Sequence, residues 1–368
     1  MDASLRVSLG RIIAQGLVPA TAALSPLDAV NNLAALQGQQ ASAIPWAIGV
    51  RCTGVSRARV EESFARGELV RSWPMRGTVH VTSARDHHWL RRLLRHRRAA
   101  WERQALSLGL TDTLVERAAQ VACELLETSP LGVSRVELVE AWGRNGIDTV
   151  TASSAQDGLR RRHLIMRLHL DGVLTAGPVR AGEHLIVDAR SLPAAPGVAK
   201  GEPGHEEALA VLAARYAWGH GPIDAAGLAR WTGLTLTEAR RALAGARVAG
   251  ESVGLPLAEC GGGLARADLA DLVEDFRAEA EAMHALPSFD ELHVGYKDRS
   301  CLTDEAGEAL ICPAKNGMFR PIVVEGGRVV AVRAPGREIV MVKGYESRRR
   351  PAARAFDDWE KWLSETQQ

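Results

Sequence analysis

The same order of predicted elements recurs three times along the chain, and it constrains the fold more than any other feature. In the first occurrence a helix over residues 4–16 comes first. A second helix opens at Ser25-Pro26, where Ser25 is the N-cap and Pro26 takes the first helical position. Ser56 caps a third helix, and residues 69–81 then predict two strands around a bend that contains proline and glycine.

The second occurrence follows the same order. The spacing of apolar residues predicts helices over residues 112–127, 134–143 and 152–171. Two short apolar segments, 173–178 and 184–187, then predict a second ribbon.

The third occurrence begins with a helix over residues 205–218. Residues 224–245 carry the best helix-turn-helix pattern of the chain, with a short helix, a tight turn at Gly233 and a second amphipathic helix over 236–245. A strand over 247–254 is predicted to follow it. Three helices followed by a ribbon is the order of a winged helix, so the sequence predicts three such units in tandem.

The last third of the chain has a different composition. An acidic helix is predicted over residues 266–284. Strands follow at 322–324, 329–332 and 339–342, separated by turns that contain glycine, and a helix over 352–364 closes the chain.

We therefore predict an α+β, mostly helical fold with three tandem winged-helix units and a β-rich C-terminal portion. A linker rich in proline, glycine and alanine, residues 193–203, marks one boundary. The predicted division is 1–103 for the first winged helix, 104–192 for the second, 193–284 for the third and 285–368 for the β-rich portion.

Cysteine usage and hydropathy exclude several classes of protein. The five cysteines, an odd number, lie far apart, with no C-x-x-C pair and no H-E-x-x-H motif. We expect reduced thiols, no metal site and no cofactor. No apolar stretch approaches ~18 residues and no signal peptide is evident, so we expect a cytoplasmic protein that does not enter a membrane.

Arginine is concentrated locally although the net charge is only +1. Such patches suit a protein with one DNA-facing side, whereas ordinary solvated helix faces would look the same. The patches consist of Arg91, Arg92, Arg95, Arg97, Arg98, then Arg160, Arg161, Arg162, Arg167, and finally Arg348, Arg349, Arg350.

Four segments in a fixed order resemble a known family. They are Leu36-Gln37-Gly38-Gln39, residues 71–80 (RSWPMRGTVH), residues 286–299 (LPSFDELHVGYKDR) and residues 316–319 (NGMF). Together they resemble the bacterial tandem winged-helix DNA glycosylases that unhook interstrand crosslinks, and the likeness covers nearly the whole chain.

The resemblance implies a catalytic Gln-x-Gln motif, formed here by Gln37 and Gln39. The residues alone would not select these glutamines, because a glutamine near a helix end is usually solvated. The implied substrates are guanines alkylated at N7, which carry a fixed positive charge, and N7-to-N7 crosslinks of the azinomycin B type. The implied roles are DNA repair and self-resistance to a toxin. A cationic base leaves without a general acid, so a Gln39 amide that holds the water and a Gln37 amide that orients it or contacts the sugar would suffice.

The resemblance and the charge pattern together give a set of DNA-contact candidates. Trp73 is expected to be structural, whereas Met318 and Phe319 are equally compatible with a buried core and with a loop that probes a groove. Asp290 is expected to hold a basic residue such as Arg299. The DNA-contact candidates are Arg71, Arg76, His80, Arg91, Arg95, Lys297, Arg299, Lys315, Asn316 and Arg320.

Three functions therefore compete. The first is a monofunctional DNA glycosylase, expected to be a monomer that acts on double-stranded DNA with alkylated or crosslinked guanine. The second is a winged-helix transcription regulator without catalytic activity, and the third is an architectural DNA-binding protein. A regulator usually carries one such unit and a dimerisation element, whereas three units are predicted here.

Overall fold

A computed structural model describes residues 1–95, 99–147, 149, 154–193 and 198–365. The chain forms two compact units. Unit 1 combines Met1–Val60 with Glu206–Gln368, and unit 2 is Glu61–His205. The boundary at His205 follows the predicted linker, whereas unit 1 is discontinuous in sequence. Arg97, Arg98 and parts of the predicted helix 152–171 and linker 193–203 lie outside the described residues.

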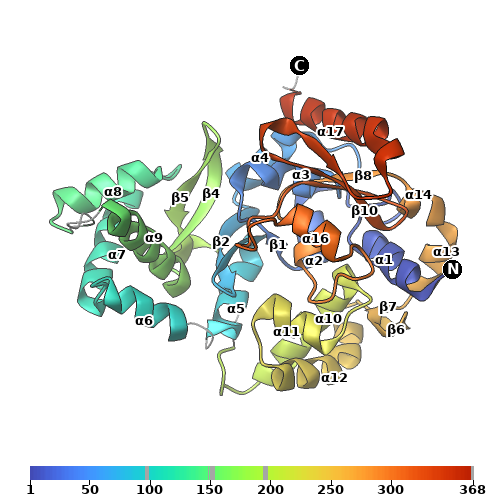
Figure 1. Ribbon diagram of the computed structural model, residues 1–368. Coiled ribbons are helices and arrows are strands. Elements are labelled where there is room, and N and C mark those ends of the chain that lie inside the picture. The colour runs from blue at the N-terminus through green and yellow to red at the C-terminus, as the bar shows by residue number, and fades with distance from the viewer. Residues whose placement is uncertain (96–98, 148, 150–153, 194–197, 366–368) are drawn as a thin grey trace. The chain divides into compact units, whose positions relative to one another are not determined.

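Unit 2 contains a small antiparallel sheet and several helices (Figure 1). In this sheet β2 pairs with both β3 and β4, and β4 pairs with β5. The helices α7, α8 and α9 pack around Trp142, which is fully buried and donates its indole N–H to the carbonyl of Ala118 at 3.0 Å. The elements are β2 (Leu69–Met75), β3 (Thr78–Ser83), α5 (Ala84–Leu93), α6 (Ala99–Ser107), α7 (Asp112–Glu127), α8 (Arg135–Arg144), α9 (Ser154–Asp171), β4 (Leu174–Arg180) and β5 (Glu183–Asp188).

Unit 1 holds the remaining elements, and α4 (Arg57–Ala65) contains the boundary between the units. The N-terminal part gives α1 (Ala3–Ala14), α2 (Pro26–Leu33), β1 (Leu36–Gln37) and α3 (Ile44–Gly49). The C-terminal part gives α10 (His205–His220), α11 (Ala225–Thr232), α12 (Leu236–Ser252), β6 (Leu257–Cys260), β7 (Gly263–Arg266), α13 (Leu269–Asp275), α14 (Arg277–Glu281), β8 (His284–Leu286), α15 (Glu291–Val294), α16 (Glu305–Ile311), β9 (Ile322–Glu325), β10 (Arg328–Arg333), β11 (Ile339–Met341) and α17 (Arg349–Ser364).

The sheet of unit 1, in the order β11-β10-β9-β8, is covered on both faces. Ile322 and Val324 of β9 pack on one side with α1, and Val323 packs on the other side with α17 (Figure 1). This alternation is the period of two expected of a strand. A bulge in β10 between Val329 and Ala331 shifts the register, which brings Val329 and Val332 to the same face.

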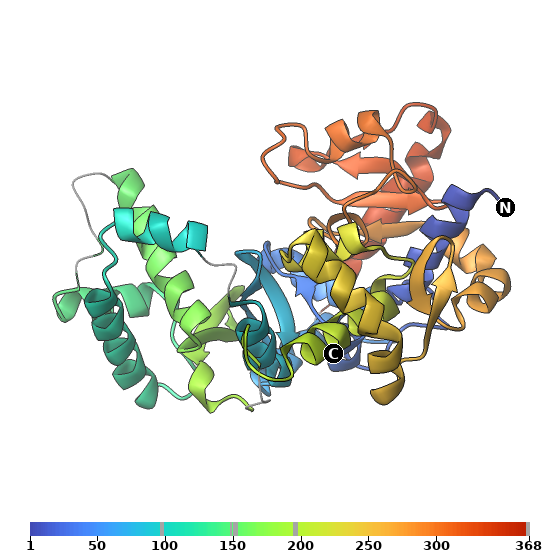
Figure 2. The ribbon, with the colours of Figure 1, turned by 90° about the horizontal axis from the view of Figure 1, so that it is seen from below.

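Helices α10, α11 and α12 lie beside one another in both views (Figures 1 and 2) and confirm the predicted helix-turn-helix. Asp224 caps α11, and Gly233 ends it with φ at 82°. Thr235 and Glu238 form a reciprocal capping box at the start of α12. The predicted strand at 247–254 is wrong, because α12 continues to Ser252. Ala239, Ala242, Ala246 and Gly250 are buried at helical spacing, and the ribbon β6–β7 follows later.

Two other predicted elements differ from the structure. The acidic helix at 266–284 is broken into α13 and α14, with Phe276 between them, and the chain becomes extended at Ala282 so that β8 can pair with β9. The helical spacing of apolar residues from Leu27 to Leu36 predicts one continuous helix there, but the helix that Pro26 opens ends at Leu33, because Ala34 adopts φ of 61°. The four consecutive residues from Leu33 to Leu36 are all buried, which one face of a surface helix could not achieve.

Most other predicted elements are confirmed, including α7 at 112–127 and the ribbons β2–β3 and β4–β5. The α+β, mostly helical class is confirmed, and each of the five cysteines is a free thiol. The number of winged-helix units and the four-part division stay predictions. Within the residues that the structure describes, no helix combines the length and hydrophobicity that a membrane span requires.

Candidate active site

The two glutamines of the Gln-x-Gln motif lie where the chain leaves α2 and forms the short strand β1. Gln37 belongs to β1 and is only 9% exposed, Gly38 is buried, and Gln39 is half-buried. The motif is therefore not on a solvated helix end, which was the alternative that the sequence left open. It lies in an extended segment directly after a buried apolar run.

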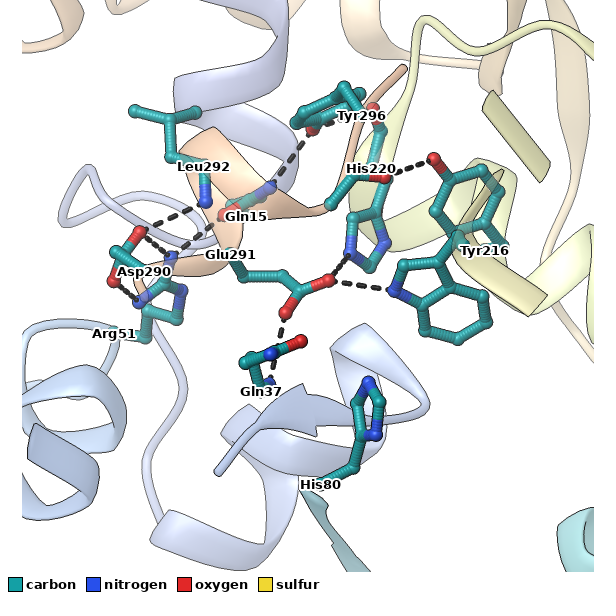
Figure 3. A network of polar contacts seen from close by, with 12 residues as sticks. Gln15, Gln37, Arg51, His80, Tyr216, His220, Asp290, Glu291, Leu292 and Tyr296 are labelled. Carbon is teal, nitrogen blue, oxygen red and sulfur yellow. Dashed lines mark hydrogen bonds and ion pairs between the residues drawn. The ribbon is translucent and has the colours of Figure 1, made fainter. Parts of the chain in front are cut away.

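A buried carboxylate contacts this segment (Figure 3). The backbone N–H of Gln37 donates to Oε2 of Glu291 at 3.0 Å. Oε1 of Glu291 lies 2.7 Å from the indole Nε1 of Trp231 and 3.2 Å from Nε2 of His220. Glu291 is 1% exposed, and both His220 and Trp231 are fully buried. These contacts bring residues 37, 220, 231 and 291 together within unit 1.

His220 is the last residue of α10 and faces several aromatic rings. Burial lowers its pKa, and the contact with Glu291 only partly opposes this effect. Because a carboxylate can only accept, Nε2 of His220 is the donor to Glu291. The ring centroid of His220 lies 4.5 Å from that of Tyr216, which stacks on Trp231 at 4.7 Å.

Asp290, the neighbour of Glu291, forms a second buried contact (Figure 3). Its two carboxylate oxygens accept from Nη1 and Nη2 of Arg51 at 2.9 and 2.8 Å, and both side chains are almost completely buried. Gln15 accepts from the same guanidinium at 2.7 Å and donates to Tyr296 at 2.9 Å. Asp290 holds a basic residue, as expected, but this residue is Arg51, and the named partner Arg299 is wrong.

Arg299 instead pairs with Glu308 at 2.8 Å, and Glu308 also contacts His293 at 3.0 Å. Arg299 and Lys315 line a pocket of about 460 Å³ beside α16. Lys297 is exposed directly after the buried Tyr296.

The loop over residues 313–320 contains Met318 and Phe319, which the sequence could not assign to a core or to an exposed loop. The two side chains differ in exposure. Met318 is 60% exposed, whereas Phe319 is half-buried and packs edge-on against Phe289 with ring centroids 5.7 Å apart. Asn316 and Arg320 line a pocket of about 510 Å³ that also includes Gln40, the residue after the motif. The structure thus places two DNA-contact candidates close to the motif in unit 1.

Five further DNA-contact candidates belong to unit 2. Arg76 is at the turn of the β2–β3 hairpin with φ of 53°, and its Nη2 lies 3.5 Å from Nε2 of His80. His80 is fully buried, and its Nδ1 is 3.0 Å from the carbonyl of Thr78, so a role for His80 would act through its neighbours. Burial lowers the pKa of Arg71 to about 10.

The remaining two unit 2 candidates, in and just after α5, already have protein partners. Arg91 donates to the carbonyl of Leu170 at 3.0 Å, and Arg95 pairs with Asp171 at 3.6 Å. Trp73 packs against the unit 2 core and meets His169 edge-on, with ring centroids 4.8 Å apart, which confirms its structural role.

Sequence reasoning missed Glu291, His220, Trp231 and Arg51. No local pattern marks a buried polar residue whose partner lies 60 to 254 positions away in sequence, as these partners do. The one available signal was the segment 286–299, which contains Glu291 and Asp290 and stands out only as part of a family pattern.

Comparison with known proteins identifies the class. The model of the family "DNA glycosylase AlkZ-like" matches residues 30–356. The chain belongs to this family of DNA glycosylases, and the family assignment favours an enzyme over a regulator or an architectural protein.

A solved structure provides a particular relative. The chain is similar to the DNA glycosylase AlkZ of Streptomyces sahachiroi, with a TM-score of 0.68 and 22% sequence identity. The match covers 99% of this chain and 96% of the AlkZ chain, so the two share a fold over their whole length. No curated protein sequence matches the chain.

Proposed function

We propose that this DNA glycosylase is monofunctional and excises guanine alkylated at N7, using Gln37 and Gln39. The observation that carries the proposal is the position of the motif. Both glutamines lie in or next to the short, buried strand β1. The backbone N–H of Gln37 in this strand donates a hydrogen bond to the buried Glu291. Such a segment suits a reaction in which placement of a water matters more than the basicity of the group that holds it.

The chemistry needs no strong base or acid from the motif. Alkylation at N7 leaves a positive charge on the purine, and cleavage of the bond between N9 and C1′ returns an electron pair that neutralises it. The amide oxygen of Gln39 accepts a hydrogen bond from the attacking water, and the amide of Gln37 orients this water or contacts the deoxyribose. The water oxygen bonds to C1′ and its proton passes to solvent, which leaves an abasic site and a neutral alkylguanine.

The same mechanism extends to crosslinks that join guanine N7 atoms of opposite strands, including those of the azinomycin B type. A glycosylase ordinarily flips its target nucleotide into a pocket, but a base tied to both strands cannot be turned out freely. The proposal therefore requires an open site. The exposed loop at 313–318, in which Met318 is 60% exposed, supports this because it can approach a groove without a closed pocket.

The DNA backbone is proposed to contact the basic candidates of both units, with the protein acting as a monomer on chromosomal DNA in the cytoplasm. Lys297 and Lys315 are exposed and serve best as phosphate contacts. Arg320 lines the same pocket as Gln40, and Arg76 lies at a hairpin turn. Repair and self-resistance to an alkylating toxin are the roles that this activity would serve.

The test is excision from a duplex oligonucleotide with one N7-methylguanine, in EDTA, followed by alkali to cut abasic sites. We expect cleavage at the lesion and none at a neutral lesion such as 1,N6-ethenoadenine. Cleavage only of an N7-crosslinked duplex would confine the activity to bulky adducts. The absence of cleavage on both cationic substrates, with folded protein that binds the duplex, would contradict the proposal.

A further inference from the structure

We propose that Glu291 is a positioning residue for base excision, because its carboxylate fixes the backbone of the catalytic segment at Gln37. The inference rests on the proposed roles of Gln37 and Gln39. It adds Glu291, which lies 254 positions from Gln37 in sequence. The Glu291 carboxylate contacts the backbone N–H of the motif at Gln37.

The geometry around the carboxylate shows how it is held. Oε2 accepts the backbone N–H of Gln37, and Oε1 accepts the side-chain N–H groups of Trp231 and His220. Three donors from three separate elements thus converge on one carboxylate that is 1% exposed. Hydrogen bonds to an ionised acceptor are roughly twice as strong as those between neutral groups.

The two donors to Oε1 are themselves fixed by packing. Trp231 lies in α11 and stacks on Tyr216 of α10, and His220 ends α10 next to the same ring. The hydroxyl of Tyr216 in turn donates to the carbonyl of Gly295 at 2.7 Å. Rotation of the Glu291 carboxylate would break bonds to both helices, so α10 and α11 together hold the carboxylate that contacts the motif.

Gly295 leaves the room that this arrangement needs. A Cβ at this position would lie 2.9 Å from Oε1 of Glu291 and 2.6 Å from the Glu291 carbonyl oxygen. Any side chain there would displace the carboxylate or its backbone. This close approach explains a glycine at position 295 without any unusual backbone angle.

Positioning matters here because the proposed catalytic groups are amides. An amide contributes by location and orientation, and β1 has only two residues to define that location. A contact that fixes the Gln37 backbone therefore affects the rate of the chemical step more than it affects DNA affinity.

The test variant is Glu291→Gln in the full-length protein. It keeps the size of the side chain, but in either orientation of the amide its NH2 group faces an N–H donor, at Gln37 or at Trp231 and His220. We expect the single-turnover excision rate on N7-methylguanine to fall by about 10²-fold, the loss that a misplacement of ~1 Å produces. Duplex affinity is expected to stay within about twofold, since DNA affinity depends mainly on phosphate contacts.

A spectroscopic measurement separates positioning from general loss of structure. In protein labelled with 15N-glutamine, the amide resonance of Gln37 is expected to move upfield in Glu291→Gln, while the resonance of Gln120 on α7 stays in place. Trp142→Phe is the matched control. It removes an equally buried hydrogen bond, the one from the indole to the carbonyl of Ala118 in unit 2, and is expected to keep the excision rate within about twofold because the contacts of Glu291 remain.

The outcomes distinguish this inference from the proposed function. Wild-type excision by Glu291→Gln, with Gln39→Ala inactive, would overturn the role of Glu291 and leave the proposed function intact. Excision that survives both Gln37→Ala and Gln39→Ala would overturn the proposed function and this inference with it. If Glu291→Gln does not fold, Trp231→Phe removes one donor to Oε1 and is expected to slow excision by about tenfold, the effect of losing one hydrogen bond to a charged group. An unchanged rate in this variant would contradict the inference.

Discussion

Two adjacent carboxylates, Asp290 and Glu291, start the short helix α15 and have different partners. Asp290 faces Arg51 and neutralises a guanidinium that is 1% exposed, whereas Glu291 accepts only N–H groups in its described contacts. A buried charge is tolerated only when it is paired and fully hydrogen-bonded. At the residue scale, Asp290 therefore stabilises unit 1 through its buried ion pair with Arg51, and in our proposal the neighbouring Glu291 carboxylate positions the motif.

Asp290→Asn leaves the Arg51 charge buried without its carboxylate. We expect a loss of about 3–5 kcal/mol in the free energy of unfolding, measured by urea denaturation. The double variant Arg51→Met with Asp290→Asn removes both charges and is expected to recover at least half of the loss. A single variant within about 1 kcal/mol of the wild type would show that water reaches the pair, contrary to its burial.

Two buried histidines of unit 2 predict a pH dependence. Burial lowers the pKa of His169 to about 3 and that of His184 to about 4, from an ordinary value near 6.5. Both pKa values are lower in the folded chain than in the unfolded chain. The contribution of the two histidines to the free energy of unfolding is therefore fully present above pH 6.5. It is lost as the pH falls from there toward 4 and 3, where the unfolded chain takes up protons that the folded chain does not.

The expected loss is about 1.4 kcal/mol per pH unit for each histidine within that window. Hydrogen exchange at the amides of β4 between pH 7.5 and 5, corrected for the intrinsic exchange rate, measures this loss in the free energy of unfolding. Burial also lowers the pKa values of His87 and His163 in unit 2, so His169→Asn removes one of several groups and should reduce the slope by less than half. A slope that stays the same in this variant would assign the pH dependence to other groups.

At the scale of elements, the helices with strong local signals could be predicted from sequence. The predicted caps Ser25 and Ser56 accept the backbone N–H groups of Asp28 and Arg59, and the boundaries of α7 agree with the prediction. The elements that were wrong depend on tertiary contacts. The extension of α12 is set by burial of small residues, and the break after α14 is set by pairing of β8 with β9. Neither tertiary contact produces a pattern that can be recognised in the local sequence.

The turn between α11 and α12 gives a prediction at this scale. Gly233 has φ of 82°, so Gly233→Ala is expected to destabilise the protein by about 1 kcal/mol. Gly158, in α9, is the matched control because it is exposed, has helical φ and has open space where an alanine methyl group would lie. Gly158→Ala should stabilise by about 0.5–1 kcal/mol. Thermal melts of the two variants that shift in the same direction would contradict this explanation.

At the scale of the whole molecule, unit 1 is assembled from two ends of the chain. The motif at residues 37–39 comes from the N-terminal segment, whereas Glu291, His220 and Trp231 come from the C-terminal one. The sequence could indicate the motif only through its likeness to a family, because the residues that surround it are distant in sequence and ordinary in composition. The family assignment and the shared fold agree with the predicted enzyme class, while the roles of the individual glutamines stay a prediction.

The most direct test of the central claim is single-turnover excision of N7-methylguanine by Gln39→Ala, with duplex affinity measured on the same preparation. Gln120→Ala is the control, since Gln120 is exposed on α7 and bonds only to Glu124 in the described contacts. We predict that Gln39→Ala loses at least about 10²-fold in excision rate, as expected when a group that positions the reacting water is removed, while its affinity and the rate of the control variant stay unchanged. Excision by Gln39→Ala at the rate of the wild type would contradict the assignment of the Gln-x-Gln motif.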